Sequence, residues 1–120
     1  MSIQSHRDLI GWQKSVELAV SLYPLTDRFP AAEKFGLVTQ LRRAGVSVPS
    51  NIAEGFGRGK TDDYLRFLRL ARGSLFEIDT QLLIAHRLGY LAEQEYREKL
   101  EQVQECGRVL AGLIKGIENS

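Results

Sequence analysis

The sequence has few of the residues from which disulfides and common metal sites are built. Among 120 residues there is one cysteine, Cys106, and there are two histidines, His6 and His86, far apart along the chain. A single cysteine excludes an internal disulfide and a zinc site made of several cysteines, and two scattered histidines do not replace those ligands. We therefore expect no metal and no cofactor.

Long apolar runs and an excess of one charge are also missing. No stretch approaches the ~20 apolar residues that span a bilayer, and residues 1–8 are mainly polar where a signal peptide would be apolar. We expect a soluble cytoplasmic protein without membrane contact. The 16 basic and 15 acidic residues give a net charge of +1, and 43% of residues are hydrophobic. This composition excludes a disordered chain and disfavours a strongly basic coat for nucleic acid.

Apolar residues recur every three or four positions over four segments, which is the spacing of one face of an α-helix. The expected helices cover roughly residues 8–28, 31–56, 62–88 and 93–117. Short links separate them, and no alternation typical of a strand competes. The sequence therefore predicts one all-α domain, residues 1–120, folded as an antiparallel up-down four-helix bundle.

Proline and glycine lie inside the expected helices. The apolar stripe of the second helix runs through Pro49 without changing register. Proline removes one backbone hydrogen bond, so we expect one helix kinked near Pro49, with a break into two helices as the alternative. The glycines inside helices are candidates for close helix approach, namely Gly45, Gly73, Gly107 and Gly112.

The first expected helix carries two apolar stripes. One stripe consists of Leu9, Trp12, Val16, Ala19 and Tyr23. The other stripe consists of Leu18, Leu22, Leu25 and Phe29. Because one bundle core needs a single stripe from each helix, we expect the second stripe to lie partly at an interface between copies of the chain.

Basic residues gather in the middle of the chain. Between residues 42 and 72, seven basic residues stand against three acidic residues, a local charge of +4. An anionic or protein partner is one explanation, and an ordinary solvated helix surface is the other. The candidate partner-binding residues are Arg42, Arg43, Arg58 and Arg72.

The second helix also carries a polar line beside Pro49. Ser47, Ser50 and Asn51 share this line with Arg43 and Glu54 at three-four spacing. The hydroxyl and amide groups either form part of a binding surface or satisfy backbone groups that the proline leaves free. Both readings stay open at this point.

The sequence offers no convincing catalytic group. Neither histidine is placed beside a serine or Cys106, and a nucleophile needs a base within hydrogen-bond reach. Glu54 and Glu77 could meet across two helices, but paired carboxylates without metal ligands are more often members of ion pairs. We expect a protein that is not an enzyme and assign no catalytic residue. A hydrolase built on Glu54 and Glu77 is the alternative.

Four blocks of sequence carry a family resemblance: DLIGWQKSVELA from residue 8, FP-x-x-E-x-FGL from 29, QLRRAGVSVPSNIAEGFGR from 40 and FLRLARGSLFEIDTQL from 67. They resemble the four-helix bundle proteins encoded in intervening sequences of bacterial 23S ribosomal RNA genes, which are related to the accessory proteins of diversity-generating retroelements. The resemblance implies a homopentamer without established enzymatic activity. It also implies RNA, DNA or a polymerase-type protein as a partner, with the four candidate arginines as the contact surface.

Two functions follow as hypotheses. The first is a non-enzymatic homo-oligomer that binds nucleic acid, or a protein that handles nucleic acid, through its arginines. The second is a protein–protein interaction scaffold without nucleic-acid contact, in which the same arginines form ion pairs between subunits. Five copies of the local +4 charge would place about twenty positive charges on one assembly, so a near-neutral chain can still form a positive surface.

Overall fold

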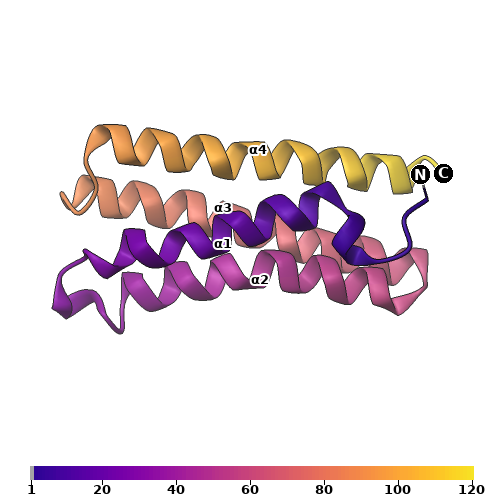
Figure 1. Cartoon of the computed structure of the whole chain (residues 1–120), viewed down its shortest axis with the longest axis horizontal. Coiled ribbons are helices and arrows are strands. Elements are labelled where there is room, and N and C mark those ends of the chain that lie inside the picture. Colours follow the sequence, from indigo (N-terminus) through magenta and orange to yellow (C-terminus); the bar gives the residue numbers. More distant parts are fainter. Residues whose placement is uncertain (1) are drawn as a thin grey trace.

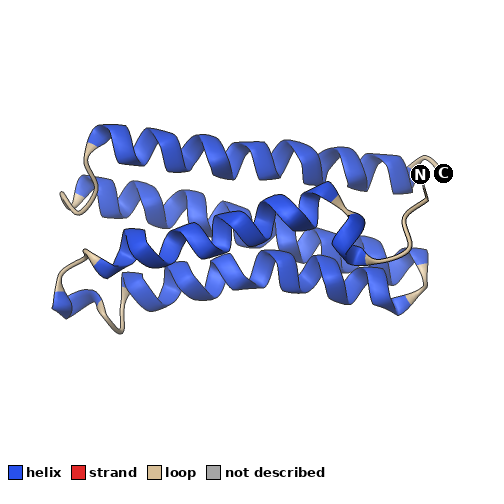
Figure 2. Cartoon of the chain, in the orientation of Figure 1, coloured by secondary structure: helices blue, strands red, loops and turns tan. Residues whose placement is uncertain are grey.

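The computed structural model describes residues 2–120, and over that range the chain forms helices, turns and loops without any strand (Figure 2). The four long helices are α1 (Ile10–Asp27), α2 (Leu37–Arg58), α3 (Thr61–Arg87) and α4 (Glu93–Glu118). Two single turns of 3₁₀ helix, η1 (His6–Asp8) and η2 (Ala31–Glu33), precede α1 and α2. Successive helices pack antiparallel, and α4 returns to α1 (Figure 1). The predicted all-α antiparallel four-helix bundle is confirmed.

The bundle is elongated, with extents of 45 × 24 × 20 Å. Both termini lie at one end, together with the α2–α3 turn (Figure 1). The α1–α2 loop and the α3–α4 turn lie at the other end. The closest packing joins α2 to α3, whereas α1 and α4 contact each other least. The pair α2 and α3 therefore forms the most extensive helix contact in the bundle.

The buried residues of α3 and α4 recur every three or four positions, in agreement with the helical spacing seen in the sequence. On α3, Leu68, Ile78 and Leu82 have no exposed surface, and on α4 Leu110 is almost fully buried. These side chains face the interior at three-four spacing, as an amphipathic helix requires. Cys106 belongs to the same core, with 3% of its surface exposed.

The two stripes of α1 both contribute to the core of the single chain. The stripe expected at a subunit interface lies in the core of the single chain: Leu18, Leu22, Leu25 and Phe29. Leu18 and Leu22 have 0% exposure, so these two side chains belong to the core of the single chain, and an interface role of the stripe stays a prediction. The other stripe is divided: Leu9 and Ala19 are buried as well, Trp12 and Val16 are half-buried, and Tyr23 turns outward. Tyr23, which belongs to it, is 42% exposed.

The second helix begins later than expected. Residues 31–36 were expected to be helical, but they form η2 and a non-helical link that ends at Gly36. The Glu33 carboxylate accepts a hydrogen bond from the Leu37 backbone N–H (3.3 Å), a donor that a helix N-terminus leaves free. The same carboxylate accepts a hydrogen bond from the Tyr90 hydroxyl (2.9 Å). Glu33 therefore starts α2 and ties its loop to the α3–α4 turn. The other helix ends agree with expectation to within two residues.

Pro49 does not break α2, so the alternative of two separate helices is excluded. The Asn51 side-chain amide donates to the Ser47 carbonyl (2.8 Å) and to the Ser47 hydroxyl (2.9 Å). These bonds join Asn51 to Ser47 across the helical turn that contains Pro49. Asn51 is therefore engaged within the chain, but its acceptor is the Ser47 carbonyl and not the Gly45 carbonyl that Pro49 leaves free.

Gly55 allows α2 to approach α3 closely. A Cβ atom at this position would lie 2.8 Å from the Phe67 Cβ and 3.2 Å from the Tyr64 carbonyl oxygen, and a backbone atom cannot move aside. We expect Gly55→Ala to lower the free energy of unfolding by about 1–3 kcal/mol, the usual effect of overpacking. Urea denaturation followed by circular dichroism measures this change.

Gly112→Ala is the matched control for Gly55→Ala. A Cβ atom at Gly112 would meet nothing within 4 Å. Alanine is the better helix former, so this variant should gain roughly 0.5–1 kcal/mol. Equal effects of the two substitutions would show that Gly55 has no special packing role.

Candidate interaction surfaces

The four candidate arginines do not form one surface, and Arg42 is already engaged within the chain. Its guanidinium donates to the Thr26 hydroxyl (2.9 Å) and forms an ion pair with Asp27 (2.8 Å). It also lies over the Tyr23 ring, 4.6 Å from the ring centre. All three partners belong to α1. Arg42 therefore joins α2 to α1 and is poorly placed to bind a partner.

Arg58 lies at the C-terminal end of α2 beside α3. It is 3.8 Å from the Glu54 carboxylate and 5.0 Å from the centre of the Phe67 ring. Arg66 lies over the same ring at 4.5 Å. These exposed contacts contribute only tenths of a kcal/mol each, so Arg58 stays accessible. It lies at one end of the bundle, apart from the other three arginines.

Arg43 and Arg72 have no ion-pair partner within residues 2–120, but they lie in different grooves. Arg43 lies in the groove between α2 and α3. Arg72 lies in the groove between α3 and α4. The structure therefore separates the two arginines that remain free to bind.

The α2–α3 groove is polar and has a volume of about 380 Å³. Its lining residues come from both helices: Gln40, Arg43, Ala44, Ser47, Ser74, Glu77 and Gln81. The Ser74 hydroxyl donates to the Ser47 hydroxyl across it (2.9 Å). The Gln81 Oε1 atom is buried without a hydrogen-bond partner, which is unusual because buried polar atoms are nearly always paired. The polar line seen in the sequence is thus one wall of this groove.

Glu54 and Glu77 lie too far apart to act together. The Ser47–Ser74 hydrogen bond fixes the register of α2 against α3. Glu54 lies seven residues beyond Ser47, and Glu77 lies three residues beyond Ser74 in the opposite direction, because the helices are antiparallel. At 1.5 Å per residue, the two positions are separated by about 15 Å along the bundle. The hydrolase alternative therefore has no structural basis.

Cys106 and His86 both lie in structural surroundings. Burial raises the pKa of the Cys106 thiol to about 11, so the thiolate needed for nucleophilic attack is scarce near neutral pH. The His86 ring stacks on Tyr96 and lies 2.9 Å from both the Leu91 carbonyl and the Glu93 carboxylate. His86 thereby holds the α3–α4 turn together. Within residues 2–120, no three histidine, cysteine or acidic side chains are grouped to hold a metal ion.

The α3–α4 groove is mostly apolar and has a volume of about 570 Å³. Its lining residues are Arg72, Leu75, Phe76, Asp79, Val103, Gln104, Gly107, Arg108 and Ala111. Phe76 is 65% exposed beside it. This groove was not predicted from the sequence, although Gly107 was expected to be a position of close helix packing. Of the four glycines expected to allow close helix approach, Gly45 does so, whereas a Cβ atom at Gly73, Gly107 or Gly112 would meet nothing within 4 Å. Gly55, which was not among them, also has this role.

A second apolar surface lies on the outward side of α1 and α2. We call it the α1–α2 ridge: Val16, Val20, Tyr23 and Val46. The exposures of Val20 and Val46 are 64% and 44%. Val46 lies next to Gly45, whose added Cβ would be 3.5 Å from the Ala19 Cα, so Val46 stands beside the middle of α1. The sequence signal for this ridge is the stripe of α1 that includes Val16 and Tyr23.

The protein is an antiparallel four-helix bundle. Its candidate binding residues Arg43 and Arg72 lie in open grooves along its sides. No helix over residues 2–120 combines the length and apolar character needed to cross a bilayer. A family model described as 23S rRNA-intervening sequence protein matches residues 7–112, and the chain belongs to this family. The resemblance to that family is therefore confirmed, while the relation to retroelement accessory proteins stays a prediction.

A crystal structure at 1.70 Å resolution has the same fold. It is described as a protein with unknown function from the S23 ribosomal protein family of Bacteroides thetaiotaomicron. The two chains share 25% sequence identity with a TM-score of 0.82, over 88% of this chain and 96% of that chain. A comparison with curated proteins found no match.

Proposed function

We propose that this protein is a non-enzymatic interaction module that assembles as a homo-oligomer, a pentamer as the family resemblance implies, and binds a protein partner in its α2–α3 groove. The observation that carries the proposal is the unpaired polar chemistry of that groove. Gln81 Oε1 is a buried acceptor without a donor, and Arg43 is a donor without an ion-pair partner. Glu77 balances the charge of Arg43. Neutral, mixed donors and acceptors suit a polypeptide better than a phosphate backbone.

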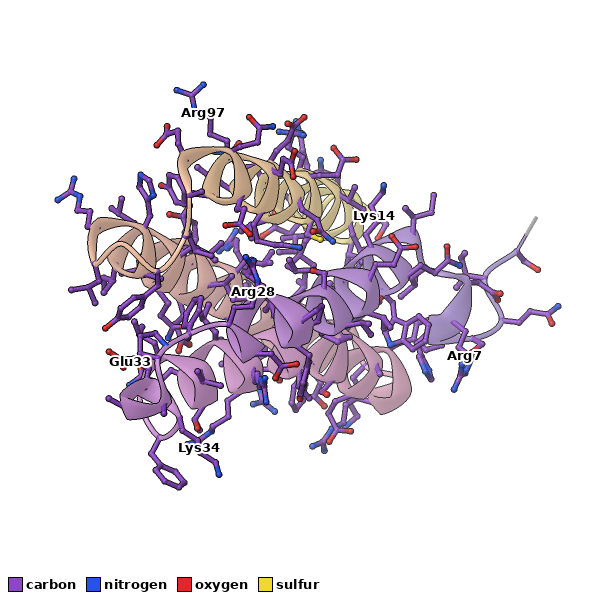
Figure 3. The ribbon with its side chains drawn as sticks, turned by 60° about the vertical axis from the view of Figure 1, so that its left-hand side comes forward. Arg7, Lys14, Arg28, Glu33, Lys34 and Arg97 are labelled. Atoms are coloured by element: carbon purple, nitrogen blue, oxygen red, sulfur yellow. The ribbon has the colours of Figure 1, made fainter. Side chains whose placement is uncertain are left out.

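Reversing the charge of the groove tests this proposal. We expect immobilised wild-type protein to retain a specific protein from a nuclease-treated lysate of its own source, and Arg43→Glu to lose that protein. Arg97→Glu is the matched control, because Arg97 points away from the bundle on α4 (Figure 3). Mass spectrometry of the retained proteins is the measurement. A partner that Arg43→Glu retains as well as the wild type would refute binding in this groove.

Direct nucleic-acid binding is the second candidate function. The observation that favours it is that Arg43 and Arg72 lack ion-pair partners within residues 2–120, so both charges are available. Repetition in an oligomer would add to their field. Gel-shift assays at about 50 mM salt should then show RNA or DNA retention that weakens steeply with added salt and in Arg43→Ala. No retention at low salt would eliminate this candidate.

A further inference from the structure

The α2–α3 groove presents its polar groups in three steps along the bundle axis. The Ser47–Ser74 hydrogen bond marks the first step, because it places these two residues opposite each other. Arg43 lies four residues before Ser47 on α2, and Glu77 lies three residues after Ser74 on the antiparallel α3. At 1.5 Å per residue, both lie about 5 Å further along the groove. Gln81, seven residues after Ser74, marks the third step at about 10 Å.

The floor of this groove is made of short side chains. Ala44 and Ser74 are each 6% exposed, and Ser47 lies beside them. The longer side chains of Arg43 and Glu77 are exposed on the two sides of this floor. The distance between packed helices depends on the size of the side chains at their contact. A floor of alanine and serine therefore lets a further helix come close to α2 and α3.

Arg43 and Glu77 line the same groove but do not pair with each other. Within residues 2–120, neither side chain forms an ion pair with any group. Both charges are thus available to a partner that brings an acidic group to Arg43 and a basic group to Glu77. Complementary charges of this kind determine which partner fits an interface and in which register.

The hydrogen bonds of the groove are also incomplete. The Ser47 hydroxyl oxygen accepts from the Ser74 hydroxyl (2.9 Å) and from the Asn51 amide (2.9 Å). A hydroxyl oxygen has two acceptor sites, so Ser47 has only its own proton left to donate. At the third step, the Gln81 Oε1 atom is a buried acceptor without a donor. The groove therefore needs one acceptor and one donor from whatever covers it.

The spacing of these groups distinguishes a helix from an extended segment. Residues i, i+3, i+4 and i+7 of a helix share one face and span about 10 Å. The three steps of the groove cover the same length with the same intervals. Side chains on one face of an extended chain recur only every ~6.7 Å. Over the length of the groove, an extended chain would fall out of step by about 3 Å.

We infer that the partner protein places an α-helix along the α2–α3 groove. The inference rests on the proposed function and names the part of the partner that binds. One face of that helix carries a short side chain that accepts from Ser47, and an acidic and a basic side chain one turn further, opposite Arg43 and Glu77. The following turn carries a donor for Gln81. This is recognition of a helix in a groove, with a polar seam in place of the usual apolar anchors.

Site-specific photocross-linking of the intact chain tests the inference. Gln40 and Ser50 are exposed positions on α2, ten residues and about 15 Å apart. Gln40→p-benzoylphenylalanine and Ser50→p-benzoylphenylalanine should attach to the same protein in a nuclease-treated lysate of the protein's own source. Mass spectrometry should place the two attachment points about ten residues apart on that protein, as in a helix, whereas an extended segment would place them about four or five residues apart.

Arg97→p-benzoylphenylalanine is the matched control, because Arg97 points away from the bundle (Figure 3). This variant should not attach to the protein that the two α2 variants capture. Attachment of that protein from all three positions would show contact without a defined site and would overturn the inference.

The other outcomes separate the inference from the proposed function. Attachment points about four or five residues apart overturn the helix and leave a protein partner in the groove. No cross-link from either α2 position, while the wild type retains a protein, overturns both proposals, because that protein binds elsewhere. Attachment to a second copy of this chain overturns the inference and makes the groove a subunit contact. Attachment to RNA or DNA before nuclease treatment assigns the groove to the second candidate function.

A reciprocal exchange of charge tests the contact at Arg43 directly. Arg43→Glu should weaken binding of the cross-linked protein, once purified, by at least about tenfold, since like charges repel across an interface. Replacement of the acidic residue of the partner helix that lies opposite Arg43 by lysine should restore binding to Arg43→Glu. Weakened binding that no such exchange restores would overturn the pairing of Arg43 with an acid of the helix.

Discussion

Gly107→Trp is expected to convert the homo-oligomer into folded monomers. An indole at this position would fill the α3–α4 groove and keep a neighbouring copy out of it. The bundle itself should remain folded, because a Cβ atom at Gly107 meets no atom of its own chain within 4 Å. The mass measured by light scattering should fall from about 67 kDa for five subunits to 13.5 kDa for one. The helical circular dichroism signal should be unchanged.

Gly112→Trp is the matched control for this substitution. Gly112 lies on the same helix, and an added Cβ there also meets nothing within 4 Å, but Gly112 does not line the groove. This variant should keep the oligomeric mass of the wild type. If both tryptophan variants stay oligomeric, the groove is not a subunit contact. If both become monomers, the contact extends beyond the groove to the outward side of α4.

The buried face of a helix could be predicted from the sequence where the helix carries one apolar stripe, but not where it carries two. The long helix α3 has a single stripe, and its leucines, Leu68, Leu75 and Leu82, are buried as the spacing predicted. The first helix has two stripes, and periodicity alone cannot say which one faces the core. The leucine stripe faces the core because Leu22 packs against Gly45 on α2, which has no side chain. A Cβ atom at Gly45 would lie only 2.7 Å from Leu22 Cδ1. That contact depends on the neighbouring helix and leaves no mark on α1 alone.

The start of α2 could not be predicted from local pattern either. Residues 31–36 have no strong helix breaker before Gly36, and Pro30 is a favourable first-turn residue. The helix starts later because Glu33 bonds to the Leu37 N–H and to Tyr90. Tyr90 lies 57 positions away in the α3–α4 turn, so this interaction is visible only in the folded chain.

The candidate site was predicted in part. The polar line of α2 was visible in the sequence, and Ser47 does lie in a polar groove. The grouping of the arginines was not reliable, because neighbouring residues on a helix point about 100° apart. Arg42 accordingly faces α1, and Arg43 faces α3. Helix geometry could have revealed this separation. The meeting of Ser47 with Ser74 could not be predicted, because a single sequence does not set the register of two helices.

The leucine stripe of α1 gives a test that distinguishes the core from the interface. We expect Leu22→Ala to lower the free energy of unfolding by about 2–5 kcal/mol, through lost apolar burial and the cavity that remains. Leu22 has no exposed surface, and its neighbour Gly45 has no side chain with which to fill the space. Since domains of this kind are stable by only about 5–15 kcal/mol, much of the stability depends on this one side chain. Urea denaturation of wild type and variant at equal concentration is the measurement.

Val20→Ala on the same helix should behave in the opposite way. Val20 is 64% exposed on the α1–α2 ridge, so its loss should change the stability of the folded chain by no more than about 0.5 kcal/mol. It should instead weaken assembly, seen as a lower mass by light scattering on dilution. The converse result, with Leu22→Ala dissociating the oligomer at unchanged chain stability, would return the leucine stripe to the subunit interface. Leu22→Ala thus tests the contribution of the buried side of α1 to folding, and Val20→Ala tests the contribution of its exposed side to assembly.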